Sequence, residues 1–122
     1  MDPLNTDIQN SDREERKYRR YPLECPVLMK FQSLGATAEV TAVSENVSIG
    51  GLMVRSPSMI PRCTQVKFTI QIHREHAFRP IYLSGEGEIV RVEKGSVLDD
   101  MFGVAVECKN PITQLEGYLP QG

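Results

Sequence analysis

Residues 64–72 read Thr-Gln-Val-Lys-Phe-Thr-Ile-Gln-Ile, and this stretch decides the fold class. Apolar side chains at Val66, Phe68, Ile70 and Ile72 alternate with polar ones. A period of two places all four apolar side chains on one face of an extended chain. The stretch therefore predicts a β-strand with one buried face and one solvated face.

The same alternation recurs on both sides of this stretch. It predicts further strands over residues 23–31, 36–44, 52–55, 81–93 and 102–108. Six short strands with at most one short helix are typical of an antiparallel barrel or sandwich. We prefer a six-stranded antiparallel β-barrel because closure removes exposed strand edges, and Pro26, Gly85 and Gly87 can supply the bends that closure needs.

The length and composition predict a single domain. A chain of 122 residues with 40% hydrophobic content has room for one ordinary core. Residues 1–12 are mostly polar and are expected to form a disordered tail. The domain then covers residues 13–122, with an arginine-rich arm (13–21), the barrel (22–109) and a C-terminal segment (110–122) that can hold a short helix.

The sequence also predicts a cytoplasmic protein with no membrane insertion. No apolar run approaches the roughly 20 residues of a membrane-spanning helix, and the N-terminus lacks the features of a secretory signal. The three cysteines, Cys25, Cys63 and Cys108, are odd in number and widely spaced, which favours reduced thiols. Cys25 and Cys108 are in phase with apolar neighbours and are expected to fill the core.

Positive charge is concentrated just before the first predicted strand. Five of the 14 basic residues fall within eight positions: Arg13, Arg16, Lys17, Arg19 and Arg20. The formal net charge of -2 argues against a protein that coats a nucleic acid polymer, but a local positive field survives. Arg16 and Arg20 offer two planar forks that fit phosphate oxygens or the O6 and N7 atoms of guanine. Alone, such a run is more often a solvated arm.

A second polar stretch, residues 46–51, lies between the second and third predicted strands and reads Asn-Val-Ser-Ile-Gly-Gly. Asn46 offers donors and an acceptor, Ser48 offers a hydroxyl, and Gly51 permits a backbone conformation that other residues resist. Alone, the stretch reads as a hairpin turn. Together with the arginine run, it predicts one site for a small anionic ligand that carries guanine.

At these two motifs the chain resembles the PilZ family, bacterial domains that bind the second messenger cyclic di-GMP. The family's R-x-x-x-R motif matches Arg16 and Arg20, and its D/N-x-S-x-x-G motif matches Asn46, Ser48 and Gly51. The resemblance covers roughly residues 15–108. It implies a six-stranded barrel whose arginine arm folds over a ligand on the barrel surface.

The resemblance also implies roles for particular residues. The implied ligand-binding residues are Arg16, Arg20, Asn46, Ser48 and Gly51, with Arg19 and Gly50 as additional candidates. The arginines would grip phosphates and guanine edges, while the amide and hydroxyl would contact a base and a phosphate. Many members have a second arginine just before the first motif arginine, where this chain has Glu15. That carboxylate can weaken anion binding or change whether one or two ligand molecules stack, unless Arg13 or Arg19 compensates.

The function that follows is a cyclic di-GMP receptor or adaptor with no enzymatic activity and no cofactor. Its arm, residues 1–20, would become ordered on ligand binding and signal to an unidentified partner protein. The alternative is a ligand-independent adaptor that only docks a partner. A barrel that binds single-stranded nucleic acid is disfavoured because few aromatic residues accompany the basic run. His73 and His76 lack further metal ligands at convincing spacing, so we interpret them as part of a solvated loop.

Overall fold

The computed structural model describes residues 18–75, 77–95 and 100–118. Its elements are β1 (Pro26–Ser33), β2 (Ala36–Ser48), β3 (Gly51–Ser56), β4 (Gln65–Ile72), β5 (Ile81–Lys94), β6 (Phe102–Cys108) and the 3-10 helix η1 (Thr113–Tyr118). The predicted tail, together with Arg13, Glu15, Arg16 and His76, lies outside the described residues. The predicted all-β class is confirmed.

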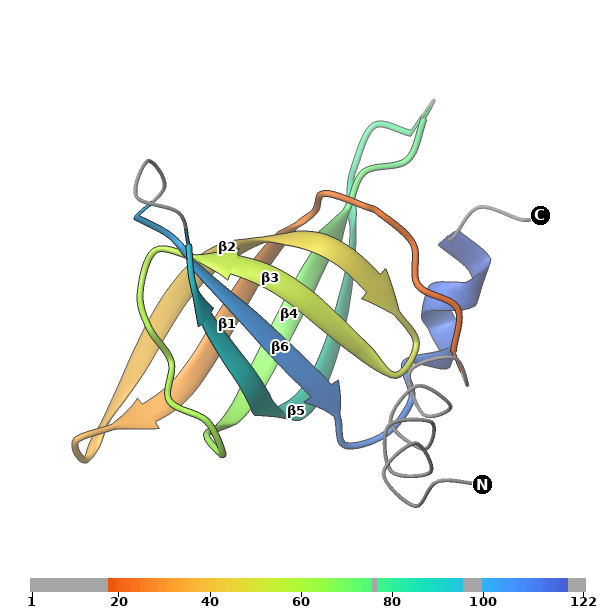
Figure 1. Cartoon of the computed structure of the whole chain (residues 1–122). Helices are drawn as coiled ribbons and strands as arrows, with labels where there is room; N and C mark the ends of the chain where they lie inside the picture. Colours follow the sequence, from red (N-terminus) through yellow and green to blue (C-terminus); the bar gives the residue numbers. More distant parts are fainter. Residues whose placement is uncertain (1–17, 76, 96–99, 119–122) are drawn as a thin grey trace, which may run out of the picture.

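The strands form a closed antiparallel barrel in the order β1-β2-β3-β6-β5-β4, and β4 pairs back onto β1 (Figure 1). The predicted six-stranded antiparallel barrel is therefore confirmed. Closure gives each strand a hydrogen-bonded neighbour on both sides, which removes the exposed edge strands of an open sheet. Apolar side chains fill the barrel interior, so most polar side chains of the strands lie on the outer surface.

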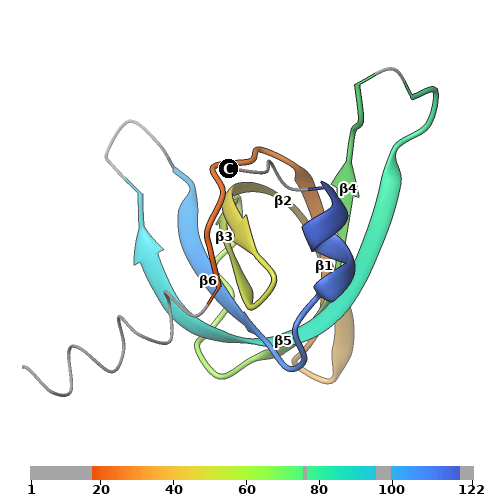
Figure 2. The same cartoon turned by 90° about the vertical axis from the view of Figure 1, so that its right-hand side faces the viewer.

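The apolar face predicted for residues 64–72 points into the barrel interior. Val66, Phe68, Ile70 and Ile72 are all buried, and Phe68 is only 1% exposed. The two ends of the barrel are covered by apolar side chains from outside the strands. Ile60 from the β3–β4 connection is fully buried, and Leu115 of η1 packs into the core from one end, where Figure 2 shows the helix.

Two strand boundaries differ from the prediction. β1 begins at Pro26 rather than at residue 23, and the backbone just before it bonds to both the backbone and the side chain of Ser44 in β2. The Ser44 hydroxyl donates to the Leu23 carbonyl at 2.6 Å and accepts from the Cys25 N–H at 2.8 Å. A first strand position suits proline, which has no N–H to donate. β2 runs on to Ser48, so the predicted turn shrinks to residues 49–50.

Neither Gly85 nor Gly87 coincides with a bulge. The pairing of β4 with β5 runs without a register shift through Gly85 and Gly87. Both glycines permit close approach: a Cβ on Gly85 would lie 2.7 Å from the Phe68 ring, and one on Gly87 would lie 2.5 Å from the Glu107 carbonyl oxygen. The irregularities are two β-bulges, at Glu45 in β2 and at Val90 in β5.

The three cysteines are free thiols, as predicted. Cys25 is buried in the core, and Cys108 is half-buried and packs against it, so both fill space beside apolar neighbours. Among the described residues, none of the helices is long and apolar enough to cross a membrane.

Cys63 has a φ of 69°, which lies in the left-handed region, and its side chain is exposed. Non-glycine residues lose about 1–2 kcal/mol in this conformation. Glycine adopts it freely but loses about 0.5–1 kcal/mol more chain entropy on folding. Cys63→Gly is therefore expected to raise the free energy of unfolding by about 0.5 kcal/mol, measured by urea denaturation. Cys63→Ala removes the thiol but keeps the Cβ, and an equal gain from it would contradict the explanation.

Candidate functional site

A cleft of about 700 Å³ lies on the outer surface of the barrel, where the arm meets the ends of β2, β3 and β6. Five of the predicted residues line this cleft: Arg20, Asn46, Ser48, Gly50 and Gly51. They come from the arm, from β2 and from the β2–β3 turn. The fold thus brings together two motifs that lie more than 20 positions apart in the chain.

The strand register arranges outward side chains of the cleft in a row. Asn46 of β2 pairs with Met53 of β3, Met53 pairs with Ala105 of β6, and Ala105 pairs with Arg91 of β5. Strands lie about 4.8 Å apart, so the two ends of a four-strand row are about 14 Å apart. Asn46 and Arg91 therefore lie on opposite sides of the cleft, and the side chains of Met53 and Ala105 form the floor between them.

Both ends of this row face outward because of the two bulges. Strict alternation from the buried Ser44 would place Asn46 inside the barrel, and alternation from the buried Ile89 would place Arg91 inside. An extra residue in each strand reverses the phase. The predicted site does not include Arg91, because alternation along a single strand does not reveal a bulge.

A second row contains Ser48, Gly51 and Glu107, on β2, β3 and β6. Gly51 leaves bare backbone between the two flanking side chains. A Cβ on Gly51 would lie 2.6 Å from the Val106 carbonyl oxygen, and its φ is not in the left-handed region. The predicted reason for this glycine, an unusual backbone conformation, is therefore wrong: the glycine allows β3 to approach β6 closely.

The two-residue turn between β2 and β3 is held by side-chain and backbone hydrogen bonds. The Ser48 hydroxyl donates to the Gly51 carbonyl at 3.3 Å and accepts from the Gly50 N–H at 3.2 Å. The Cys108 N–H donates to the Gly50 carbonyl at 2.9 Å, and the Ile112 N–H donates to the Ile49 carbonyl at 2.7 Å. Ser48 is only 7% exposed, so its hydroxyl organises the turn in addition to bordering the cleft.

The described part of the arm lies along β2. Tyr21 and Val47 exchange two backbone hydrogen bonds of 2.8 Å, which extends the pairing of β2 beyond the start of β1. The Arg19 guanidinium lies 5.5 Å from the centre of the Tyr21 ring, at a distance suited to a cation–π contact, and Arg19 is not among the residues lining the cleft. Arg20 does line it, and the Tyr18 ring lies directly over Gly50. Of the arm that was predicted to be mobile, Tyr18 and Arg20 thus lie against the barrel.

The described lining residues carry charges of both signs. Among the described residues that line the cleft, Arg20 and Arg91 are the cations and Glu107 is the only carboxylate. The Arg91 Nε lies 3.3 Å from a Glu93 carboxylate oxygen, which orients the guanidinium. Burial, followed by the negative charge of Glu107, raises the pKa of the Cys108 thiol from 9.0 to about 11. The Cys108 thiol therefore stays protonated at neutral pH. The described residues contain no cluster of three potential metal ligands.

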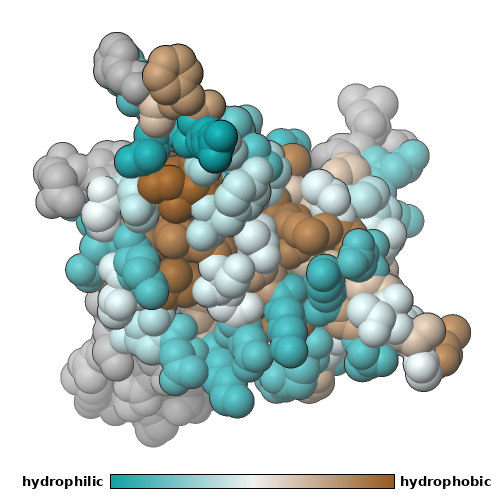
Figure 3. All heavy atoms as spheres, turned by 180° about the vertical axis from the view of Figure 1, so that it is seen from behind, coloured by the Kyte–Doolittle hydropathy of each residue, from teal (hydrophilic) through white to brown (hydrophobic). Residues whose placement is uncertain are grey.

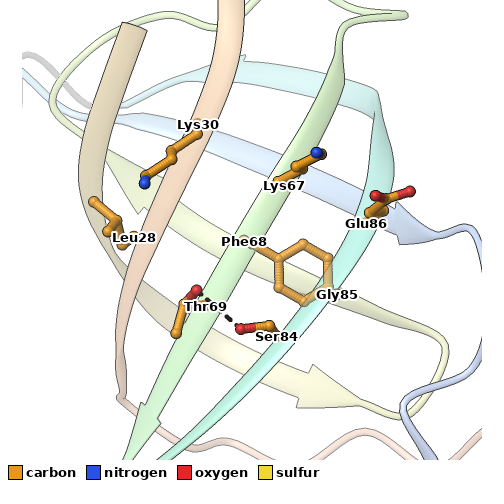
Figure 4. A pocket seen from close by; sticks show the side chains of 8 residues that line it. All are labelled: Leu28, Lys30, Lys67, Phe68, Thr69, Ser84, Gly85 and Glu86. Atoms are coloured by element: carbon orange, nitrogen blue, oxygen red, sulfur yellow. Dashed lines mark hydrogen bonds between the residues drawn. The ribbon is translucent and has the colours of Figure 1, made fainter. Parts of the chain in front are cut away.

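A smaller hollow of about 390 Å³ lies on the outer face of β1, β4 and β5 (Figure 4). Lys30 and Lys67 border it on one side, and the hydroxyls of Thr69 and Ser84 lie 3.2 Å apart on the other. Its lysines face carboxylates, since Lys30 pairs with Glu39 at 3.5 Å and Lys67 is opposite Glu86 in the register. None of the predicted ligand-binding residues that the structure describes lines this hollow, which distinguishes it from the cleft.

Large exposed apolar side chains occur mainly away from the cleft. Leu34 and Phe78 are fully exposed and belong to the β1–β2 and β4–β5 loops, which project from the barrel (Figure 1). Seen from behind, the surface between these loops mixes hydrophilic and apolar residues (Figure 3). The arginine-bordered cleft is therefore the best candidate for a functional site among the described residues.

The structure is a closed six-stranded barrel with a surface cleft beside an arginine-bearing arm. The family model of the PilZ domain matches residues 14–119, and the chain belongs to the PilZ domain family. This is a family of cyclic di-GMP receptor and adaptor domains. The resemblance seen at the two motifs is thereby confirmed.

Solved structures share the fold at low sequence identity. MotI/DgrA, an inhibitor of motility from Bacillus subtilis, superposes with a TM-score of 0.66 and 16% identity over 85% of this chain and 47% of that one. The chain thus spans about half the length of MotI/DgrA. The PilZ domain of CeSA from a cellulose-synthesizing bacterium has a TM-score of 0.51 and 23% identity, over 79% of this chain and 86% of that one.

The PilZ domain of YcgR from Escherichia coli, in a structure with c-di-GMP, has a TM-score of 0.57 and 11% identity, over 85% of each chain. No curated protein sequence matches the chain. At these identities the structural likeness shows the shared fold alone.

Proposed function

We propose that this domain is a cyclic di-GMP receptor that transmits ligand binding to a partner protein. The observation that carries the proposal is the convergence of Arg20, Asn46, Ser48 and Gly51 on one cleft. These residues match the two motifs by which the chain resembles its family. Their convergence on one surface is what a shared ligand requires.

The chemistry of the cleft suits a cyclic dinucleotide with two phosphates and two guanines. The Arg20 fork fits phosphate oxygens or the O6 and N7 edge of guanine, and the Asn46 amide can both donate to and accept from a base. Arg91, on the far side of the cleft, offers a second fork. Met53 and Ala105 between them give a floor against which the flat face of a base can pack. Arg16, which lies outside the described residues, would add a third fork.

The proposed signal is a change in the arm. Tyr21 is fixed to Val47 by two hydrogen bonds, so the arm is anchored at its barrel end beside the cleft. Binding of a dianion would draw the preceding arginines toward the ligand and so order the arm over the cleft. The surface created in this way would be recognised by the partner.

Arg20→Ala is the substitution that tests the site. We expect isothermal titration calorimetry to show binding of cyclic di-GMP to the wild type. The affinity of the variant should fall at least about tenfold, because a hydrogen bond to a charged group contributes about 1.5–3 kcal/mol. Arg62→Ala is a matched control, since Arg62 is exposed in the β3–β4 connection and does not line the cleft.

The two failures of this experiment have different meanings. Absence of binding by the wild type would contradict the receptor function and favour the ligand-independent adaptor. Wild-type binding with equal affinity in Arg20→Ala would instead show that the ligand occupies another surface.

A further inference from the structure

We propose that Glu107 determines the base specificity of the cleft: its carboxylate accepts the N1–H and N2–H donors of a guanine and excludes adenine. This inference rests on the proposed function, because it concerns how the cleft selects among cyclic dinucleotides. It assigns a role to a residue that lies in neither motif.

The position of Glu107 gives its side chain access to a ligand in the cleft. It lies on β6 with its side chain exposed, in phase with the outward Ala105 and out of phase with the buried Val106. Its cross-strand partner on β3 is Gly51, which has no side chain to cover it. The carboxylate therefore lies beside an uncovered part of the cleft floor, with Ser48 on the other side of the glycine.

A carboxylate at this place opposes general anion binding. The negative charge of Glu107 contributes to the raised pKa of Cys108, another lining residue, so its field reaches the cleft wall. It would repel the phosphates of any cyclic dinucleotide. A ligand whose hydrogen-bond donors face the Glu107 carboxylate would explain why this residue lies in a site for an anion.

Guanine brings two such donors on one edge. Its N1–H and N2 amino group can both donate to the two oxygens of a carboxylate, which is an acceptor only. Adenine presents an acceptor at N1, which a carboxylate repels. The arginine forks use a different edge of guanine, O6 and N7, so Arg20 or Arg91 and Glu107 can contact one base together.

The test is Glu107→Gln, with cyclic di-GMP and cyclic di-AMP each titrated by calorimetry. We expect the wild type to prefer cyclic di-GMP and the variant to lose about 10- to 100-fold of this preference, the effect of one bidentate base contact. Part of the change should be tighter binding of cyclic di-AMP, because the glutamine amide offers both a donor and an acceptor, as adenine requires.

Glu88→Gln is the matched control. Glu88 is the cross-strand partner of Glu107 on β5, carries the same charge and does not line the cleft. It should keep the preference of the wild type. Equal changes in both variants would show that Glu107 acts only through its charge, and an unchanged preference in Glu107→Gln would show no role in reading the base. Either result overturns the inference while leaving the receptor function intact, whereas a wild type that binds neither dinucleotide overturns both.

Discussion

Replacing Phe68 with alanine is expected to lower the free energy of unfolding by about 3–5 kcal/mol, the range for truncating a large aromatic side chain in a packed core. Phe68 is 1% exposed and lies at the centre of the strand whose alternation predicted the fold. Its ring fills the space beside Gly85, so truncation leaves a cavity that backbone cannot fill. Guanidinium denaturation followed by circular dichroism would measure the loss.

Phe78→Ala is the control for Phe68→Ala because the Phe78 side chain is fully exposed in the β4–β5 loop. It should change the free energy of unfolding by no more than about 0.5 kcal/mol.

Gly85→Ala tests the same packing from the opposite side of the contact. Its new Cβ would lie 2.7 Å from the Phe68 ring, so it should destabilise the wild type but be better tolerated once the ring is gone. Additive effects of Gly85→Ala and Phe68→Ala would contradict the packing described.

The fold was predictable because alternation is a local property that the whole chain repeats. The apolar face of residues 64–72 became the barrel interior, and its neighbours followed the same rule. The alternation failed at Asn46 and Arg91, where a bulge reverses the phase. A bulge is stabilised by pairing with a partner strand, so the sequence of one strand does not reveal it.

The glycines illustrate the same limit. The sequence suggested bends at Gly85 and Gly87 and an unusual backbone conformation at Gly51, but it did not reveal that all three glycines permit close approach to other chain segments. The carbonyl oxygen of Val106, a residue more than 50 positions away, leaves no room for a Cβ on Gly51. Contacts of this range depend on topology, which local sequence does not specify.

The candidate site was only partly predictable for a related reason. The two motifs predicted which residues share a site, and in the structure Arg20, Asn46, Ser48 and Gly51 line one cleft. Nothing in the sequence marked Glu107, because an acidic residue is not what an anion site suggests. Only the register that pairs it with Gly51 places it there.

Gly51→Ala is the second substitution with a large expected effect. Its Cβ would lie 2.6 Å from the Val106 carbonyl oxygen, and backbone of a paired strand cannot rotate away as a side chain can. β3 and β6 must therefore separate, at a cost of about 1–3 kcal/mol in the free energy of unfolding. Because the two strands form the cleft floor, affinity for cyclic di-GMP should fall as well.

Gly50→Ala is the matched control for Gly51→Ala. Whereas Gly51→Ala strains the pairing of β3 with β6, Gly50→Ala would displace only the arm. The atoms that its Cβ would meet belong to the Tyr18 ring, the end of a side chain that can turn aside. We expect its free energy of unfolding to stay within about 0.5 kcal/mol of the wild type in the same denaturant titration. An equal loss in both variants would mean that the contact of β3 with β6 is not what requires Gly51. A loss confined to Gly51→Ala would show that this motif glycine is required for the close packing of β3 against β6, the two strands that form the cleft floor.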